Sequence, residues 1–221
     1  MVTAADIIAE LKAARAPGDL EDVSRFYTAG SPWNLILGLR IPKIFPIAKS
    51  HRDVPLAVVS ALLDDPHYEV RMAAMTILDA KARLKSWDHK ALYDLYLTKL
   101  DRIDNWDLVD RAAPFVIGEY LVDKDRRPLD DLAISDLPQG RRTAIVATAA
   151  FLKRGETEDT FRIAEALAED RNAYVQKALG SWLREAGKRD PEALSVFLAA
   201  HAHTLPRSTI AAAGKALPEA G

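Results

Sequence analysis

The feature that most constrains this chain is its helical periodicity, which runs from one end of the sequence to the other. Apolar residues recur at helical spacing, and Val, Ile and Thr do not cluster into alternating strands bounded by turn residues. Short breaks separate the helical stretches, as at Pro17-Gly18. Asp65-Pro66 and Asp190-Pro191 each place an N-cap candidate before a proline at the first helical position. The sequence therefore predicts an all-α fold.

The spacing of the breaks predicts a repeat. We expect helices at 3–15, 20–29, 42–50, 54–64, 67–84, 87–100, 106–121, 128–135, 140–153, 158–168, 172–187, 191–202 and 206–217. From residue 54 these helices pair, and the second helices begin near 67, 106, 140, 172 and 206. Such intervals lie near the period of helical-pair repeats, roughly 33 to 47 residues.

This period favours an α-solenoid of HEAT-like antiparallel helix pairs over a closed bundle, because each pair needs a neighbour to cover its apolar side. We expect the solenoid to be curved, with one concave face. We expect a single domain over residues 1–221, with N-terminal helices in 1–52 and paired repeats in 53–217.

Composition excludes several kinds of site. The chain has no cysteine, which excludes a disulfide, a thiolate metal site and a cysteine nucleophile. Its five histidines form no metal signature, so we expect neither a metal nor a cofactor. No apolar run reaches the roughly 18 residues of a membrane span, and the N-terminus does not resemble a signal peptide. We therefore expect a cytoplasmic protein without membrane association.

Charge is distributed unevenly. The net charge of −2 argues against strong nonspecific binding of nucleic acid. However, the predicted second helices carry basic residues near their starts, which would stack along one face of a solenoid. Such a row would suit a phosphate backbone, or would be an ordinary solvated helix face. Its members are Arg71, Arg111, Arg141, Arg142, Lys177 and Arg207.

Trp106 and Asp110 form the most informative pair. They are four residues apart, so they share one face of the predicted helix, while Leu108 and Val109 point to the core. Asn105 or Asp104 can cap this helix. One interpretation is a core Trp with an Asp that caps or forms an ion pair. The other is a site for a developing cation, because a carboxylate and an indole face both attract positive charge.

Five stretches, in this order and spacing, resemble the AlkD-like DNA alkylation repair family of HEAT-like repeat glycosylases. They are LGLRIP at 37–42, NWDLVD at 105–110, RRTAIVAT at 141–148, KALGSWLREAGKR at 177–189 and LPR at 205–207. The resemblance implies hydrolysis of the N-glycosidic bond of purines alkylated at N3 or N7 in duplex DNA, without a cofactor. We expect a monomer that is associated with the nucleoid when it is bound to DNA.

The resemblance also assigns roles by position. Asp110 matches the catalytic aspartate, which stabilises an oxocarbenium ion and positions water. Trp106 matches an aromatic residue that packs on the DNA beside the lesion. Arg142 matches an arginine that contacts a backbone phosphate, or alternatively forms a surface ion pair. Arg141 and Lys177 lie in the same motifs, as further candidates for DNA contact.

The chain departs from the family pattern at one position that bears on activity. The family motif reads Gly-Trp, whereas Gly180 is followed here by Ser181, with the tryptophan at Trp182. One residue rotates a side chain by about 100 degrees on a helix, so Trp182 is either core or, if the helix start is shifted, a DNA contact. Tyr27 and Trp33 would contact DNA or pack the first repeat. A non-catalytic DNA-binding paralogue and a protein-interaction scaffold remain alternatives.

Overall fold

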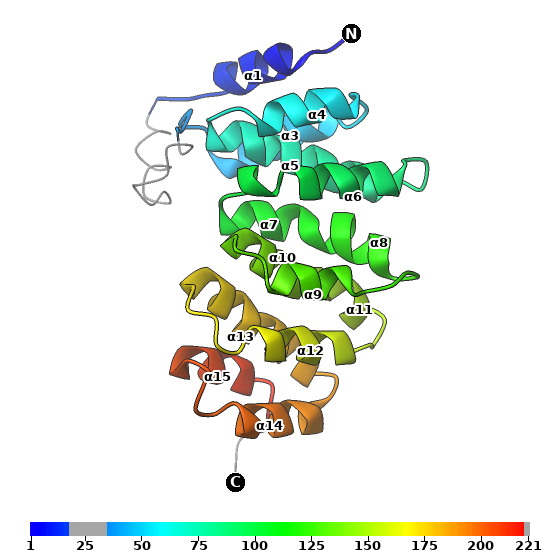
Figure 1. Cartoon of the computed structure of the whole chain (residues 1–221). Coiled ribbons are helices and arrows are strands. Elements are labelled where there is room, and N and C mark those ends of the chain that lie inside the picture. Colours follow the sequence, from blue (N-terminus) through cyan, green and yellow to red (C-terminus); the bar gives the residue numbers. More distant parts are fainter. Residues whose placement is uncertain (18–34, 219–221) are drawn as a thin grey trace. The chain divides into compact units, whose positions relative to one another are not determined.

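The chain is all-helical in the part that the computed structural model describes, residues 1–17 and 35–218 (Figure 1). Apart from helices, those residues contain one isolated bridge, between Leu35 and His67. This confirms the predicted all-α fold class. The predicted helix at 20–29, with Tyr27, and the nearby Trp33 lie outside the described residues.

Contacts group the chain into two compact units, Met1–Ala112 and Ala113–Gly221. The single domain and the concave curvature expected from the sequence therefore stay predictions. No helix in the described ranges is both long and apolar enough to cross a membrane.

Helices in the first unit follow the sequence prediction closely. Between them, short connections occupy the predicted breaks. Pro114 follows the last of these helices directly. The elements are α1 (Ala4–Ala13), α3 (Ile41–Ser50), α4 (Leu56–Leu63), α5 (Tyr68–Ala82), α6 (His89–Thr98), the 3₁₀ turn η1 (Leu100–Arg102) and α7 (Trp106–Ala113).

Helices in the second unit also agree with the prediction, and in Figure 1 they follow one another as helix pairs in chain order. Those predicted at 158–168, 172–187, 191–202 and 206–217 are all present within a few residues. The elements are the π-helical turn η2 (Pro114–Gly118), α8 (Glu119–Leu121), α9 (Pro128–Ala133), α10 (Pro138–Ala147), α11 (Ala149–Leu152), α12 (Glu158–Ala166), α13 (Ala173–Gly187), α14 (Pro191–Ala200) and α15 (Arg207–Gly214).

The helix predicted at 106–121 is the main exception, because the structure divides it. Its middle is the π-helical turn η2, which begins at Pro114. A proline has no N–H for the regular helical hydrogen bond, and π turns are one way in which a helix absorbs such a defect. In this turn the N–H of Glu119 donates to the carbonyl of Pro114, five residues earlier.

Helix starts confirm one of the two predicted Asp-Pro caps. Asp190 accepts a hydrogen bond from the N–H of Ala193 (2.9 Å), and Pro191 begins α14. The other prediction was wrong, because α5 begins at Tyr68 and its N-cap residue is His67. Asp65 instead accepts from the N–H of His67 (2.8 Å), which closes the turn ahead of the helix.

A recurring side-chain contact supports the repeat organisation. Near the start of three second helices, a polar side chain reaches back to a carbonyl six residues earlier in the preceding connection. Arg71 does so in α5, Arg141 in α10 and Gln176 in α13. Their acceptors are the carbonyls of Asp65 (3.1 Å), Ser135 (2.8 Å) and Asp170 (2.8 Å). Each contact satisfies a backbone carbonyl in the connection before the helix, so three of the second helices share one local arrangement.

The second helices form the centre of each unit. In the first unit α5 packs against α3 and α4, and its residues are buried on nearly all sides. In the second unit α13 packs against α10, α12, α14 and α15. A second helix is therefore covered by its own partner and by neighbouring repeats, as in a repeat protein stabilised by nearest-neighbour interfaces.

The stretch at 37–42 is held by a buried carboxylate. Glu69 is fully buried, and its side chain accepts hydrogen bonds from the N–H groups of Leu37 (2.9 Å), Gly38 (2.8 Å) and Leu39 (3.1 Å). Gly38 has a φ of 81°, a conformation that favours glycine. Three donors on one carboxylate compensate its burial and fix this segment against the start of α5.

Candidate nucleic-acid interface

Trp106 and Asp110 both reach solvent from α7. Trp106 is the first residue of the helix and is 41% exposed, and Asp110 is exposed one turn later. Leu108 and Val109 are fully buried, which confirms their predicted place in the core. An exposed indole and an exposed carboxylate at helical neighbour positions can face the same ligand.

Asp107 lies between these two residues and has a different environment. Its side chain is largely buried and accepts a hydrogen bond from the hydroxyl of Tyr68, the first residue of α5. Its Oδ1 atom is buried and has no hydrogen-bond partner among the described residues. Burial raises the pKa of the Asp107 carboxyl, against the opposing effect of the Tyr68 hydrogen bond.

A second contact joins α5 to the start of α7. Arg71 is 1% exposed, and its guanidinium donates to Asp104 (2.8 Å) and to the carbonyls of Asp65 and Pro66. Asp104 therefore binds Arg71, whereas one of the two sequence interpretations made it a cap for the helix. The prediction that Arg71 belongs to a row of cations on one face was wrong. Its guanidinium is buried and paired with Asp104 inside the first unit.

Arg111 also makes a contact within the first unit. Its guanidinium carbon lies 4.0 Å from the centre of the Phe45 ring, a cation–π geometry. A side chain stacked in this way has a preferred orientation, so Arg111 is less adaptable than a freely solvated cation.

In the second unit, Arg141 is held by internal partners. Its Nε donates to Asp170 (2.6 Å), and its terminal nitrogen donates to the carbonyls of Ser135 (2.8 Å) and Asp136 (3.2 Å). The Asp170 side chain is 5% exposed, so this ion pair is shielded from water on one side. These contacts favour a structural role for Arg141, although a DNA contact stays a prediction.

Arg142 is 6% exposed, and a terminal nitrogen donates to the carbonyl of Tyr174 in α13. Tyr174 itself is 45% exposed, and its N–H donates to the side chain of Asn172, the N-cap residue of α13 (2.9 Å). Arg142 thus fixes the first turn of α13 from the neighbouring helix. The phosphate contact of Arg142 stays a prediction.

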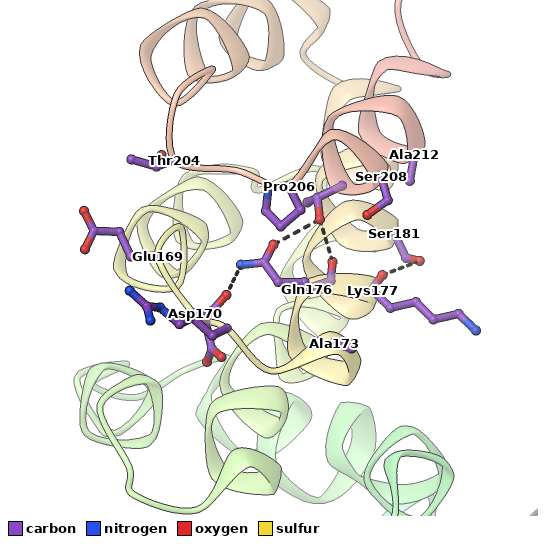
Figure 2. A pocket seen from close by; sticks show the side chains of 12 residues that line it. Glu169, Asp170, Ala173, Gln176, Lys177, Ser181, Thr204, Pro206, Ser208 and Ala212 are labelled. Atoms are coloured by element: carbon purple, nitrogen blue, oxygen red, sulfur yellow. Dashed lines mark hydrogen bonds between the residues drawn. The ribbon is translucent and has the colours of Figure 1, made fainter.

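Lys177 is exposed and borders a groove of about 950 Å³ in the second unit. Figure 2 shows the lysine extending away from the buried Gln176, which faces Thr209. Small residues of α13 and α15 line the groove, among them Ala173, Ser181, Ser208 and Ala212. The carboxylates of Glu169 and Asp170 also line it, so the groove combines both signs of charge with hydroxyls and suits a polar ligand.

Ser181 and Trp182 have different surroundings, and the role of Trp182 stays a prediction. The Ser181 hydroxyl donates to the Lys177 carbonyl (3.0 Å), one turn earlier in α13, and the residue lines the groove. Trp182 is half-buried and is not among the residues of this groove. A β-carbon at Gly180 would lie 3.0 Å from Ala212 and 3.1 Å from the Thr209 carbonyl, so Gly180 permits the close approach of α15.

The candidate residues belong to two units. Trp106 and Asp110 lie in the first, whereas Arg141, Arg142, Lys177 and Trp182 lie in the second. A single surface that contains both groups remains a prediction. Within the described ranges, no group of three or more His, Asp or Glu side chains is arranged to hold a metal ion.

Sequence reasoning missed Tyr68 and Tyr174. The signal for Tyr68 is the repeat interval itself, because Tyr68 and Asp107 are 39 residues apart and lie in the first turns of successive second helices. No sequence signal singles out Tyr174, because a cap at Asn172 predicts a helix start and not the exposure of a later residue.

Comparisons with solved structures show the same fold. A structure described as a predicted DNA alkylation repair enzyme from Enterococcus faecalis is 16% identical, with a TM-score of 0.70 over 93% of this chain and 98% of that chain. The smu.31 protein of Streptococcus mutans UA159 is 15% identical, with a TM-score of 0.56 over 97% and 99% of the chains. AlkD2 from Streptococcus mutans is 16% identical, with a TM-score of 0.53 over 98% and 96%.

The comparison with curated proteins found no match. In contrast, the sequence model of the family described as DNA alkylation repair enzyme matches residues 7–217, nearly the whole chain. The matched span contains both Trp106 and Asp110 and all of the candidate basic residues. The chain therefore belongs to the DNA alkylation repair enzyme family.

Proposed function

We propose that this chain is a monofunctional DNA glycosylase that hydrolyses the N-glycosidic bond of purines alkylated at N3 or N7 in duplex DNA. The observation that carries the proposal is the pairing of an exposed indole with an exposed carboxylate, Trp106 and Asp110, one turn apart on α7. Membership of a DNA alkylation repair family supports DNA as the substrate class.

The chemistry suits a site with one carboxylate. An N3- or N7-alkylated purine carries a positive charge, so the electron pair of the breaking C1′–N bond neutralises the departing base. The sugar then develops oxocarbenium character, which the anionic Asp110 stabilises. The same carboxylate orients a water whose oxygen bonds to C1′ and whose proton is released. Trp106 packs beside the lesion, where its ring face favours the developing cation.

Duplex DNA is the proposed partner, and the enzyme needs no cofactor in this scheme. Lys177 and Arg142 are the proposed phosphate contacts, with Arg141 and Trp182 as further candidates. A planar guanidinium suits a phosphate well, whereas lysine acts as a point charge. We assign Lys177 to phosphate binding rather than to a Schiff-base step, so excision leaves an abasic site with the strand intact.

Product analysis tests this proposal. Duplex DNA methylated at N7 of guanine and N3 of adenine is incubated with the protein, and free bases and abasic sites are quantified separately. The proposal expects equal amounts of free base and abasic site, without strand cleavage. Strand cleavage without added alkali, or abasic sites without a released purine, would contradict a monofunctional hydrolase.

A non-catalytic DNA-binding paralogue is the second candidate, and Ser181 favours it. A small side chain lines the groove beside Lys177, at the position where the family motif has an aromatic residue. Duplex binding without base release would support this candidate and overturn the first. Absence of both binding and release would favour a protein-interaction scaffold, for which the net charge of −2 is the main argument.

A further inference from the structure

The first turn of α5 contains an unusual number of buried polar side chains. Tyr68 and Arg71 are each 1% exposed, and Glu69 is fully buried. Glu69 holds the backbone at residues 37–39, whereas Tyr68 and Arg71 both reach toward the start of α7. Their acceptors are Asp107 and Asp104, which lie on either side of Trp106 in the sequence.

Backbone hydrogen bonds alone hold the start of α7 weakly. The helical backbone continues from α7 through η2 to Leu121, but the first-turn bond from the Val109 N–H to the Asn105 carbonyl is long, at 3.4 Å. The first N–H groups of any helix also lack partners within it. Side chains from α5 therefore contribute much of what fixes this turn.

The Tyr68–Asp107 contact has features that stability alone does not explain. Asp107 is largely buried, and its Oδ1 atom has no hydrogen-bond partner among the described residues. Burial also raises its pKa. A well-packed apolar pair at the same place would avoid this cost, since replacing buried polar pairs by apolar residues is often neutral or stabilising. Costly buried groups of this kind are concentrated at functional sites.

We propose that Tyr68 is a positioning residue for Asp110 and Trp106, and that it acts through its hydrogen bond to Asp107. Asp107 and Asp110 are three residues apart on α7, so a rotation of the first turn moves the Asp110 carboxylate as well. Arg71 and Asp104 supply the second point of attachment, which stops the turn from pivoting about the first. This inference rests on the proposed function of Asp110.

Tyr68→Phe is the test variant, because it keeps the ring and removes only the hydroxyl. The matched control is Tyr96→Phe, which changes a fully buried tyrosine of α6 in the same unit. The readouts are the single-turnover rate of base excision at saturating enzyme and the Kd for the same duplex. We expect Tyr68→Phe to slow excision about tenfold or more, with a Kd within about twofold of the wild type. Tyr96→Phe should change neither.

Substitutions at Asp107 separate positioning from simple burial. Asp107→Asn retains an oxygen that can accept from Tyr68, whereas Asp107→Leu does not. We expect Asp107→Asn to keep more of the excision rate than Asp107→Leu, at similar Kd. A wild-type rate in Tyr68→Phe, or equal losses in the two Asp107 variants, would overturn the proposal.

A further readout distinguishes failure of this inference from failure of the proposed function. If the wild-type protein releases no base, the glycosylase assignment fails, and backbone hydrogen exchange of residues 104–112 tests the attachment by itself. Faster exchange in Tyr68→Phe than in the wild type and Tyr96→Phe would support it. Equal exchange in all three proteins would overturn it.

Discussion

The first turns of α7 and α13 occupy equivalent places in two repeats, yet they carry opposite charges. Asp110 lies four residues after the start of α7, and Lys177 lies four residues after the start of α13. Each is exposed, and each helix also exposes an aromatic residue in its first turn, Trp106 or Tyr174. The two helices thus share one frame, in which the exposed side chain at this position is negative in α7 and positive in α13.

The two turns are also supported differently. In α13, the Asn172 side chain accepts from the N–H groups of Tyr174 (2.9 Å) and Val175 (3.2 Å), so the helix is capped by its own sequence. In α7, the support comes from Tyr68 and Arg71 of another helix. The first turn of α13 is held by its own cap, and α7 is in addition attached to α5 through Tyr68 and Arg71. We therefore expect the chemistry at α7 to be more sensitive to distant substitutions than binding at α13.

The largest expected effect comes from removing the charge at the α7 position. Asp110→Asn should reduce the excision rate about a hundredfold or more, because the variant lacks the anion that stabilises the sugar cation. Its Kd for lesion-containing duplex should stay within about twofold, since the carboxylate acts in the transition state. Single-turnover kinetics with a parallel binding titration measures both. An unchanged excision rate would contradict a catalytic role for Asp110.

Arg142→Ala should have the next largest effect, on binding and on stability. Loss of its charged hydrogen bond to the Tyr174 carbonyl, from a side chain that is only 6% exposed, typically costs about 1.5–3 kcal/mol. If the guanidinium also contacts phosphate, lesion and undamaged duplexes both bind more weakly, and the slope of log K against log salt becomes shallower by about 0.9. A reduced stability with an unchanged salt slope would assign Arg142 to positioning of α13 alone.

Lys177→Ala separates phosphate binding from stability more clearly than Arg142→Ala does, because Lys177 is exposed whereas Arg142 is nearly buried. We expect a salt slope that is shallower by about 0.9, with little change in the free energy of unfolding. Salt-dependent titration against undamaged duplex gives the slope, and chemical denaturation gives the stability. An unchanged slope would remove Lys177 from the proposed phosphate contacts.

Removal of the N-cap side chain of α13 should have a smaller effect. Asn172→Ala should lower the free energy of unfolding by about 1 kcal/mol, as is usual for loss of an N-cap side chain. Because the cap acts locally on α13, excision per bound enzyme should be unchanged. Denaturation curves combined with single-turnover rates check this expectation. A fall in the single-turnover rate as large as that in Tyr68→Phe would remove the contrast between the two helices.

Asp107 should make the stability of the folded protein depend on pH. Burial raises its pKa above the ordinary 3.8, so the folded protein retains a proton that the unfolded chain has already lost. Stability therefore declines as pH rises from 3.8 through the folded pKa. Asp107→Asn removes this decline, so the stability difference, variant minus wild type, should increase with pH in that range. A difference independent of pH would contradict the raised pKa.

Much of the fold could be predicted because helix periods and breaks are local signals. The helix that begins at Pro138 and the helix that follows Asp190 both start within a few residues of their expected positions. Pro114 was missed as an interruption, because the apolar pattern continues through it while the backbone widens to a π turn. Asp65 was misplaced because both a cap and a turn place Asp before Pro, and only the neighbouring N–H groups distinguish them.

The site could be predicted only in part. Spacing on one helix placed Trp106 and Asp110 on a common face and Leu108 in the core, but it left open a core Trp106, which is 41% exposed in the structure. Whether a cation is exposed depends on partners from other repeats, which spacing does not reveal. Arg71 was therefore included in an exposed row, although Asp104 and two carbonyls bind it inside the first unit. The same limit explains why Tyr68 was not recognised.

The central claim, that Asp110 stabilises positive charge on the sugar, is tested most directly with two uncleavable duplexes. One contains a cationic azasugar and the other a neutral tetrahydrofuran at the same position, and Kd is measured for wild type and Asp110→Asn. We expect the wild type to bind the cationic duplex about tenfold or more tightly than the neutral one. Asp110→Asn should lose this preference. An equal preference in both proteins would show that Asp110 does not stabilise the sugar cation.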